Sequence, residues 1–451
     1  MRLRIRHNGA CHHYPVLPLQ RPNFLQPFLK LTAINILSNL LVPIAGLLDM
    51  AFLGHLAEIR HLAGVALATV LFNYLYWTFG FLRMSTTGMT AQAVGRDDQS
   101  EMMLIGLRHS ILALLLGMGI IIFQVPLRQL GFAILSATPE VEAAGQAFYN
   151  ALIWGAPATL LNFVIIGWFL GRSQSRYVLM LTAINSIANV LLDYWLIVRS
   201  GWASTGAGLS TAMSQYLTLG GGLLILSQTV ELKQVQFARL WDGSALSTLF
   251  TLNRDLMIRT LVLISTFAIF TNLGSSFGSI PLSANALLLQ VVTLAAYFID
   301  GIAFATETFA GLFRGQGNHN QLKQLVRLAG GASFLVGILF AIAFMTYPDW
   351  LFGQLTVHTQ VLTYLKQYVF WLLPVLGFGS IAYMLDGYFL GLTQGKILRQ
   401  AMMQSVLIGF VPLAVGAWYW QSNHWLWLAL SLFMAMRSLS LGARLKHDLN
   451  E

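Results

Sequence analysis

Charged residues are scarce in this 451-residue chain. Asp, Glu, Lys and Arg together make up 10% of it, whereas 56% of the residues are hydrophobic and the mean hydropathy is +0.67. Soluble globular domains carry about 25% charged residues, so the composition excludes an ordinary soluble protein. It predicts a chain that lies mostly within a lipid bilayer.

Cysteine is nearly absent as well, with Cys11 as the single example. This excludes a disulfide framework, and the neighbouring His12 and His13 lack the spacing of a structural zinc site. A nucleotide-binding loop is also missing, because the stretch from Gly391 to Lys396 is one residue short of G-x-x-x-x-G-K-[ST] and no Ser or Thr follows. We therefore expect no cofactor and no ATP-driven activity.

The chain does contain twelve apolar segments, each long enough to cross a bilayer as a helix. An even number of spans places both termini on one side, and the distribution of basic residues identifies that side as the cytoplasm. The basic residues left outside are only Arg60, Arg128, Arg199 and Lys366. The net charge of +9 then reflects contact with anionic inner-leaflet lipid and not with nucleic acid. The predicted fold is an all-α polytopic membrane protein.

An internal repeat divides the chain into halves. An offset of 220 residues aligns Leu53-Gly54 with Leu273-Gly274, Gly95 with Gly315, and Trp168 to Gly171 with Tyr388 to Gly391. Six spans per half preserve orientation on duplication, so we expect two pseudo-symmetric six-helix lobes. The predicted divisions are a basic cytoplasmic tail (1–25), a first lobe (26–228), a cytoplasmic linker (229–255), a second lobe (256–443) and a cytoplasmic tail (444–451).

Five carboxylates interrupt or border the apolar segments, namely Asp49, Asp193, Asp300, Glu307 and Asp386. A charged side chain near the bilayer centre costs about 2.5 to 3.5 kcal/mol, so such residues usually mark an ion or substrate path. None of the aspartates has an acidic counterpart at the 220-residue offset. The acids therefore indicate chemistry specific to each lobe.

Asn185, Asn189 and Asp193 recur every four residues, which places them on one face of the predicted fifth span. This polar stripe must face a cavity or another helix and not lipid. Asp49 ends the first span near the same outer level, so Asp49 and Asp193 can share a pocket and hold a proton between them. The alternative is that these side chains only make interhelical hydrogen bonds that fix packing.

The second-lobe acids Asp300, Glu307 and Asp386 lie toward the inner ends of their spans, where basic side chains can pair with them. The basic residues considered for this pairing are Arg254, Arg259 and Arg314. An inner salt-bridge network and a role in transport both remain open for these acids. We expect few Lys or Arg residues in the middle of the spans.

Several sequence motifs resemble those of the multidrug and toxic compound extrusion (MATE) family, in its DNA-damage-inducible protein F (DinF) branch. The resemblance runs through all twelve predicted spans. The motifs are Leu-Val-Pro-Ile-Ala-Gly-Leu-Leu-Asp49 followed by Gly54-His55-Leu56, Arg83-Met-Ser-Thr-Thr-Gly-Met-Thr-Ala-Gln92-Ala, Leu252-Asn-Arg-Asp255 and Leu385-Asp386-Gly387. The resemblance implies two six-helix lobes around a central cavity, and extrusion of organic compounds in exchange for protons or sodium ions across a bacterial cytoplasmic membrane.

The resemblance also implies site residues. The family's first-lobe coupling positions match Asp49, Asn189, Asp193 and Thr211 in this chain, and they are the residues expected to bind H⁺ or Na⁺. A second-lobe glutamate that other branches carry on span seven has no counterpart here. A family proline in span one is replaced by Ile34, which leaves Pro43 as the expected helix kink.

The resulting prediction is a secondary active antiporter, not an enzyme, that acts as a monomer. Aromatic residues make up 12% of the chain, which favours amphiphilic or cationic organic substrates. A flippase for lipid-linked precursors is the alternative within transport, although its acidic headgroups would require a basic cavity. An integral-membrane transferase is disfavoured because the loops are short and the carboxylates lie within spans.

Overall fold

The computed structural model describes residues 24–56, 58–135, 137–229, 237–356 and 358–448. Residues 1–23 of the predicted basic tail, with Cys11, His12 and His13, lie outside these ranges, as do residues 230–236 of the linker and 449–451 of the second tail. Every regular element in the described part of the chain is a helix. This follows from the apolar sequence, because a backbone in lipid must satisfy its own hydrogen bonds.

Twelve helical segments are long and apolar enough to cross a membrane, as the sequence predicts. In the first half they are α1 (Leu25–Gly54), α2 and α3 (Ile59–Thr78 and Phe81–Gly95), α4 (Gln99–Ile122), α6 and α7 (Pro139–Leu152 and Ala156–Gly171), α8 with the π-helical turn η2 (Ser175–Asp193 and Tyr194–Arg199), and α9 (Ala203–Thr229).

In the second half the spans are α10 (Gly243–Ser276), α11 (Ser279–Gly315), α12 (His319–Thr346), α15 (Leu372–Gly391) preceded by the 3₁₀ turn η5 (Val369–Trp371), α16 and α17 (Gly395–Gln404 and Val411–Trp420), and α18 (Asn423–Asp448). Shorter helices are α5 (Gln124–Ile134), α13 (Pro348–Gly353) and α14 (Thr359–Lys366). Helix α10 extends back to Gly243, so much of the stretch predicted as a linker is helical.

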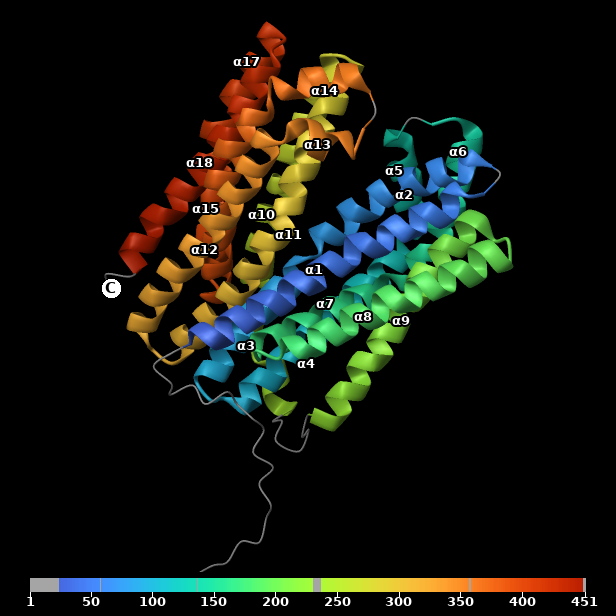
Figure 1. Ribbon diagram of the computed structural model, residues 1–451. Helices are drawn as coiled ribbons and strands as arrows, with labels where there is room; N and C mark the ends of the chain where they lie inside the picture. Colours follow the sequence, from blue (N-terminus) through green and yellow to red (C-terminus); the bar gives the residue numbers. More distant parts are fainter. Residues whose placement is uncertain (1–23, 57, 136, 230–236, 357, 449–451) are drawn as a thin grey trace, which may run out of the picture.

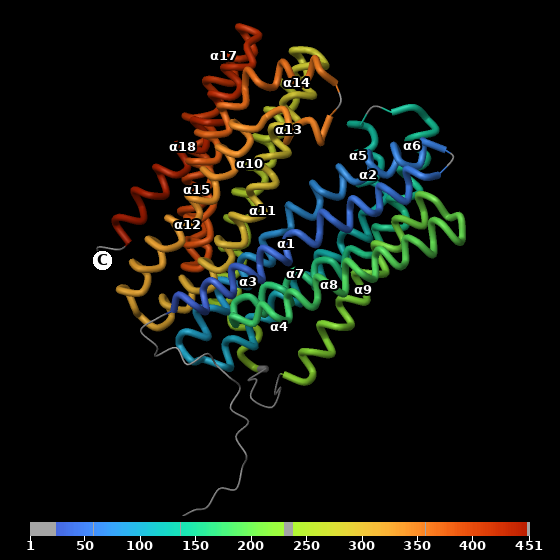
Figure 2. Tube along the Cα trace, viewed as in Figure 1, coloured from blue at the N-terminus to red at the C-terminus, as the bar shows by residue number. Residues whose placement is uncertain are grey.

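The two halves form two helical bundles that meet at one end and diverge toward the other (Figure 1). The Cα trace shows α1 of the first bundle lying beside the second bundle, where it packs against α11 (Figure 2). We call the end where the bundles meet the closed end. It contains the turns after α3, α7, α11 and α15.

The internal repeat is visible in the backbone. Six of the eight described residues with positive φ form three pairs 220 positions apart, namely Asp97 and Gly317, Ser173 and Thr393, and Gly201 and Gln421. Helix caps repeat at the same offset, because Asp98 accepts a hydrogen bond from Glu101 N at 2.9 Å and Asn318 accepts one from Gln321 N at 3.1 Å. The two lobes therefore share turn geometry as well as span order.

Glycines allow the lobes to touch at the closed end. Gly95 of α3 lies against Gly315 and the Leu312 carbonyl of α11, with no room for a Cβ atom on either glycine. The contact is also polar, because Gln92 Nε2 donates to the Gly391 carbonyl at 2.9 Å. Close backbone approach through small residues is a common way for helices to associate in lipid.

We predict that Gly95→Ala separates the lobes at the closed end, because the added methyl group would overlap the α11 backbone. Spin labels on Gln99 and His319, one in each lobe, should give a longer mean distance by pulsed electron paramagnetic resonance. Gly331→Ala is the matched control, since nothing lies within 4 Å of a Cβ atom built there. An unchanged distance in the Gly95 variant would contradict the contact.

Candidate ion-coupling site and buried charge cluster

The predicted polar stripe of the first lobe faces a neighbouring helix. Helix α8 packs between α1 and α9, and Asp193 at the end of α8 is 0% exposed. Its carboxylate accepts a hydrogen bond from Ser210 Oγ of α9. Ser210 could not be identified from the sequence, because the same helix also carries Ser214 and Thr218 and nothing in the sequence distinguishes the three.

Asp49 of α1 meets Asp193 of α8 at this point. The two carboxyl groups interact directly through their side chains, as expected from their predicted level. Asp49 Oδ1 and Asp193 Oδ2 are buried and have no hydrogen-bond donor among the described residues. Two carboxylates in contact cannot both remain charged without compensation, so a proton or a small cation would satisfy both oxygens.

The other predicted polar residues join α8 to α9. Asn189 Nδ2 donates to Thr211 Oγ1 at 3.4 Å, which brings together the two polar residues implied by the resemblance. Asn185 instead accepts hydrogen bonds from Ser214 at 3.1 Å and from Thr218 at 3.5 Å. Both asparagines are thus bonded to α9.

Two backbone features flank the acids. Directly after Asp193 the chain forms the π-helical turn from Tyr194 to Arg199, a local widening that is frequent at functional sites. Pro43 lies inside α1, which is helical from Leu25 to Gly54 without interruption. The kink at Pro43 stays a prediction.

The second lobe contains a buried charge cluster. Arg259 of α10 and Arg437 of α18 both contact the same oxygen of Asp386 on α15, Oδ2. Pairing with Arg259 was considered from the sequence, but Arg437 was missed because it lies in an apolar segment with no acid near it in the chain. Arg254 pairs with its neighbour Asp255 at 3.2 Å and not with the predicted acids.

A further ion pair joins the two lobes. Arg83 of α3 contacts Glu307 of α11 at 3.4 Å, and its guanidinium lies 4.1 Å from the centre of the Phe304 ring. The expectation of few basic residues within the spans was therefore wrong for Arg83, Arg259 and Arg437. Arg83 lies within a span because α2 and α3 together continue from Ile59 to Gly95.

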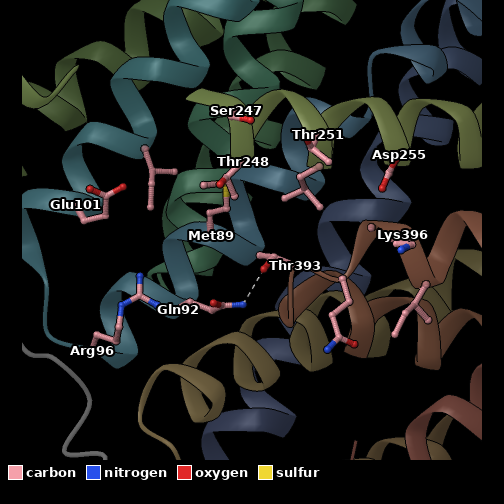
Figure 3. A pocket seen from close by; sticks show the side chains of 15 residues that line it. Met89, Gln92, Arg96, Glu101, Ser247, Thr248, Thr251, Asp255, Thr393 and Lys396 are labelled. Carbon is pink, nitrogen blue, oxygen red and sulfur yellow. Dashed lines mark hydrogen bonds between the residues drawn. The ribbon is translucent and has the colours of Figure 1, made fainter. Parts of the chain in front are cut away.

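A separate cavity of about 570 Å³ lies at the closed end, between α3 and α4 of the first lobe and α10 and the α15–α16 turn of the second. Figure 3 shows Arg96 and Lys396 on its walls, with Gln92 bonded to Thr393 across the lobes. None of the predicted coupling residues lines this cavity. It belongs to the closed contact between the lobes and not to the acidic pair.

We predict that Asp386→Ala lowers the free energy of unfolding by about 3 to 5 kcal/mol, because it leaves two buried guanidinium groups without their carboxylate. The midpoint of thermal unfolding in detergent would measure the loss. Asp349→Ala is the control, since Asp349 is 73% exposed and its pair with Lys366 should contribute about 1 kcal/mol or less. Equal losses in the unfolding midpoint for the two substitutions would show that the buried cluster stabilises the fold no more than an exposed ion pair does.

Comparisons with known proteins agree with this architecture. The MatE family model matches residues 35–195 and 256–415, one stretch in each lobe. The chain is 35% identical over 413 residues to DNA damage-inducible protein F of Escherichia coli, covering 90% of this chain and 89% of that protein. It is 24% identical over 371 residues to a probable multidrug resistance protein NorM of Synechococcus, covering 80% and 79% of the two chains.

Solved structures show the same fold. A crystal structure of a MATE protein in a bent conformation superposes with a TM-score of 0.86 at 17% identity, covering 94% of this chain and 95% of that one. An outward-facing multidrug resistance MATE transporter gives a TM-score of 0.84 at 17% identity, with 94% and 96% covered. By its family model and its likeness to DNA damage-inducible protein F, the chain belongs to the MATE family.

Proposed function

We propose that this protein is a secondary active transporter that exports amphiphilic organic compounds in exchange for protons or sodium ions. The observation that carries the proposal is the buried pair of Asp49 and Asp193, in which one oxygen of each carboxyl group has no donor in the described chain. Membership of the MATE family supports export, as does likeness to a protein named for multidrug resistance.

The acidic pair suggests how an ion can drive a conformational change. A proton or sodium ion arriving from outside would neutralise the pair and favour one arrangement of α1, α8 and α9. Release of the ion on the other side would restore repulsion between the carboxylates and favour the second arrangement. Each ligand then shifts the balance between two conformations in proportion to its differential affinity for them.

The orientation follows from charge. The closed end carries basic residues in its turns, among them Arg96, Arg172 and Lys396, and basic residues concentrate on the cytoplasmic side of membrane proteins. We therefore assign the closed end and both termini to the cytoplasm, with the protein in a bacterial inner membrane. One chain contains both the acidic pair and the charge cluster, so a monomer has all the residues that the proposed transport function uses.

A flippase for lipid-linked precursors is the second candidate. The sequence argues against it because few basic residues are expected within the spans, but the structure places three there. Arg83, Arg259 and Arg437 lie within spans, so guanidinium groups that bind an acidic headgroup are present, although Glu307 and Asp386 pair with them in this structure. Movement of lipid by such a protein need not depend on Asp49, whereas antiport does.

We predict that proteoliposomes export a fluorescent amphiphile when a pH gradient or a sodium gradient is imposed, and that Asp49→Asn abolishes this coupling. The asparagine side chain does not ionise, so the variant has no negative charge at position 49 for the ion to neutralise. Each gradient is applied separately, and the amphiphile is tested as a carboxylate and as a quaternary ammonium compound.

Asp349→Asn serves as the control, because it removes an acid that is exposed and remote from the pair. Efflux driven by one gradient, lost in the Asp49 variant and kept in the control, identifies the ion. Concentrative export that persists in Asp49→Asn rejects the assignment of Asp49. Movement that ignores both gradients favours the flippase.

A further inference from the structure

The arginine pair of the second lobe is unusual in how it shares its partner. Arg259 and Arg437 converge on a single carboxylate oxygen, Asp386 Oδ2. The two arginines are 5% and 0% exposed, and Asp386 is 4% exposed. Two positive side chains thus contact one negative group in a region where water cannot readily compensate charge.

The pair also has more hydrogen-bond donors than the protein satisfies. A guanidinium group carries five N–H donors and no acceptor. Arg437 Nε, Arg437 Nη1 and Arg259 Nε are buried and have no acceptor among the described residues. Each unpaired buried donor costs free energy, and only a group that accepts hydrogen bonds can remove this cost.

Asp300 does not fill this role. It lies within electrostatic range of Arg83, Arg259 and Arg437, yet in the described chain it forms no ion pair within 4 Å, unlike Asp386 and Glu307. Asp300 therefore offsets part of the positive charge without supplying the missing acceptors. The three donors without an acceptor belong to the arginine pair, and Tyr383 is the other side chain that interacts with Arg437.

The side of α11 and α15 is the less buried face of the cluster. Asp300 of α11 and Tyr383 of α15 are only partly buried, unlike the arginines behind them. The Arg437 guanidinium lies 5.0 Å from the centre of the Tyr383 ring. Tyr383 is thus a partly exposed side chain beside the buried Arg437.

We propose that Arg259 and Arg437 bind an anionic group of the transported compound, such as a carboxylate, phosphate or sulfonate. Planar guanidinium groups bind these oxyanions through paired, charge-assisted hydrogen bonds. Asp386 acts as an internal substitute that holds the arginines in place when no ligand is bound. The inference rests on the proposed transport function, and it names organic anions and zwitterions as the substrate class.

The test is a binding measurement on the purified full-length protein in detergent. The probes are dansylglycine, which carries a carboxylate, and the matched dansyl derivative in which a trimethylammonium group replaces it. Fluorescence titration should show tighter binding of the carboxylate probe. Arg437→Gln should weaken that binding about tenfold, because a charge-assisted hydrogen bond is lost, and should leave the ammonium probe unchanged.

Asp386→Asn should have the opposite effect and tighten binding of dansylglycine, because the internal competitor is removed. If the salt bridge were only structural, substitution of Arg437 and substitution of Asp386 would change dansylglycine binding in the same direction. Acetate should also raise the unfolding midpoint of Asp386→Asn more than that of the wild type. This rescue keeps the test informative if the variant is unstable, and Arg437→Lys replaces Arg437→Gln if the glutamine variant does not fold.

Arg108→Gln is the matched control. Arg108 is 4% exposed and pairs with Glu101 at 2.8 Å, but it lies in the first lobe away from the cluster. Its loss should leave binding of both probes unchanged. Phosphatidylglycerol in mixed micelles provides a further arm, because displacement of dansylglycine by this lipid assigns the anionic group to a headgroup, and lack of displacement assigns it to a soluble compound.

Failure to bind dansylglycine, a preference for the ammonium probe, or unchanged dansylglycine binding in Arg437→Gln would overturn the inference. None of these results bears on gradient-driven export, which is measured in proteoliposomes. Conversely, a protein that binds dansylglycine through Arg437 but shows no ion-driven efflux would keep the anion site and reject the antiport mechanism.

Discussion

The absence of water from the bilayer core is the constraint on which the rest of this structure depends. Backbone polar groups must be satisfied within each helix, which explains why the described spans are helical throughout. Side chains face the same demand, so polar groups in the spans collect where helices meet. Asp193 is bonded to Ser210 of the next helix, and Asp386 is bonded to two arginines from two other helices. The polar atoms that still lack a partner include oxygens of Asp49 and Asp193 and donors of Arg259 and Arg437.

The contact between the lobes is built so that it can open. At the closed end it includes glycine backbones in contact and hydrogen bonds such as Gln92 to the Gly391 carbonyl. It also includes apolar packing across the lobes, such as Phe28 of α1 against Phe309 of α11. Helices gain no hydrophobic stabilisation from packing against each other in lipid, so shape and these few polar contacts must hold the lobes together.

Much of the architecture could be predicted from the sequence, because span length and turn positions are local properties. The twelve spans follow from the apolar segments, and the two halves follow from the repeat at an offset of 220 residues. The meeting of Asp49 with Asp193 follows from the spacing by four along the fifth span and from the shared level of the two acids. Contacts between distant segments carried no such signal. Arg437 meets Asp386 only because α15 and α18 pack together, and Arg83 reaches Glu307 only because α3 touches the other lobe. Single basic residues in apolar sequence do not reveal their partners.

The two lobes differ in charge, and this difference restricts how an ion and a substrate can influence each other. In the described chain the first-lobe acids interact with each other and with Ser210, whereas three arginines surround the acids of the second lobe. A cation bound at the first site cannot displace an anion at the second by direct competition, so the coupling must pass through helix positions. Helix α1 provides a physical route, because it carries Asp49 toward one end and contacts α11 elsewhere. There Asn39 donates to the Tyr297 carbonyl at 3.2 Å, and Ile36 packs against Gly301, the neighbour of Asp300. A shift of α1 on ion binding would therefore move the element that borders the arginine pair.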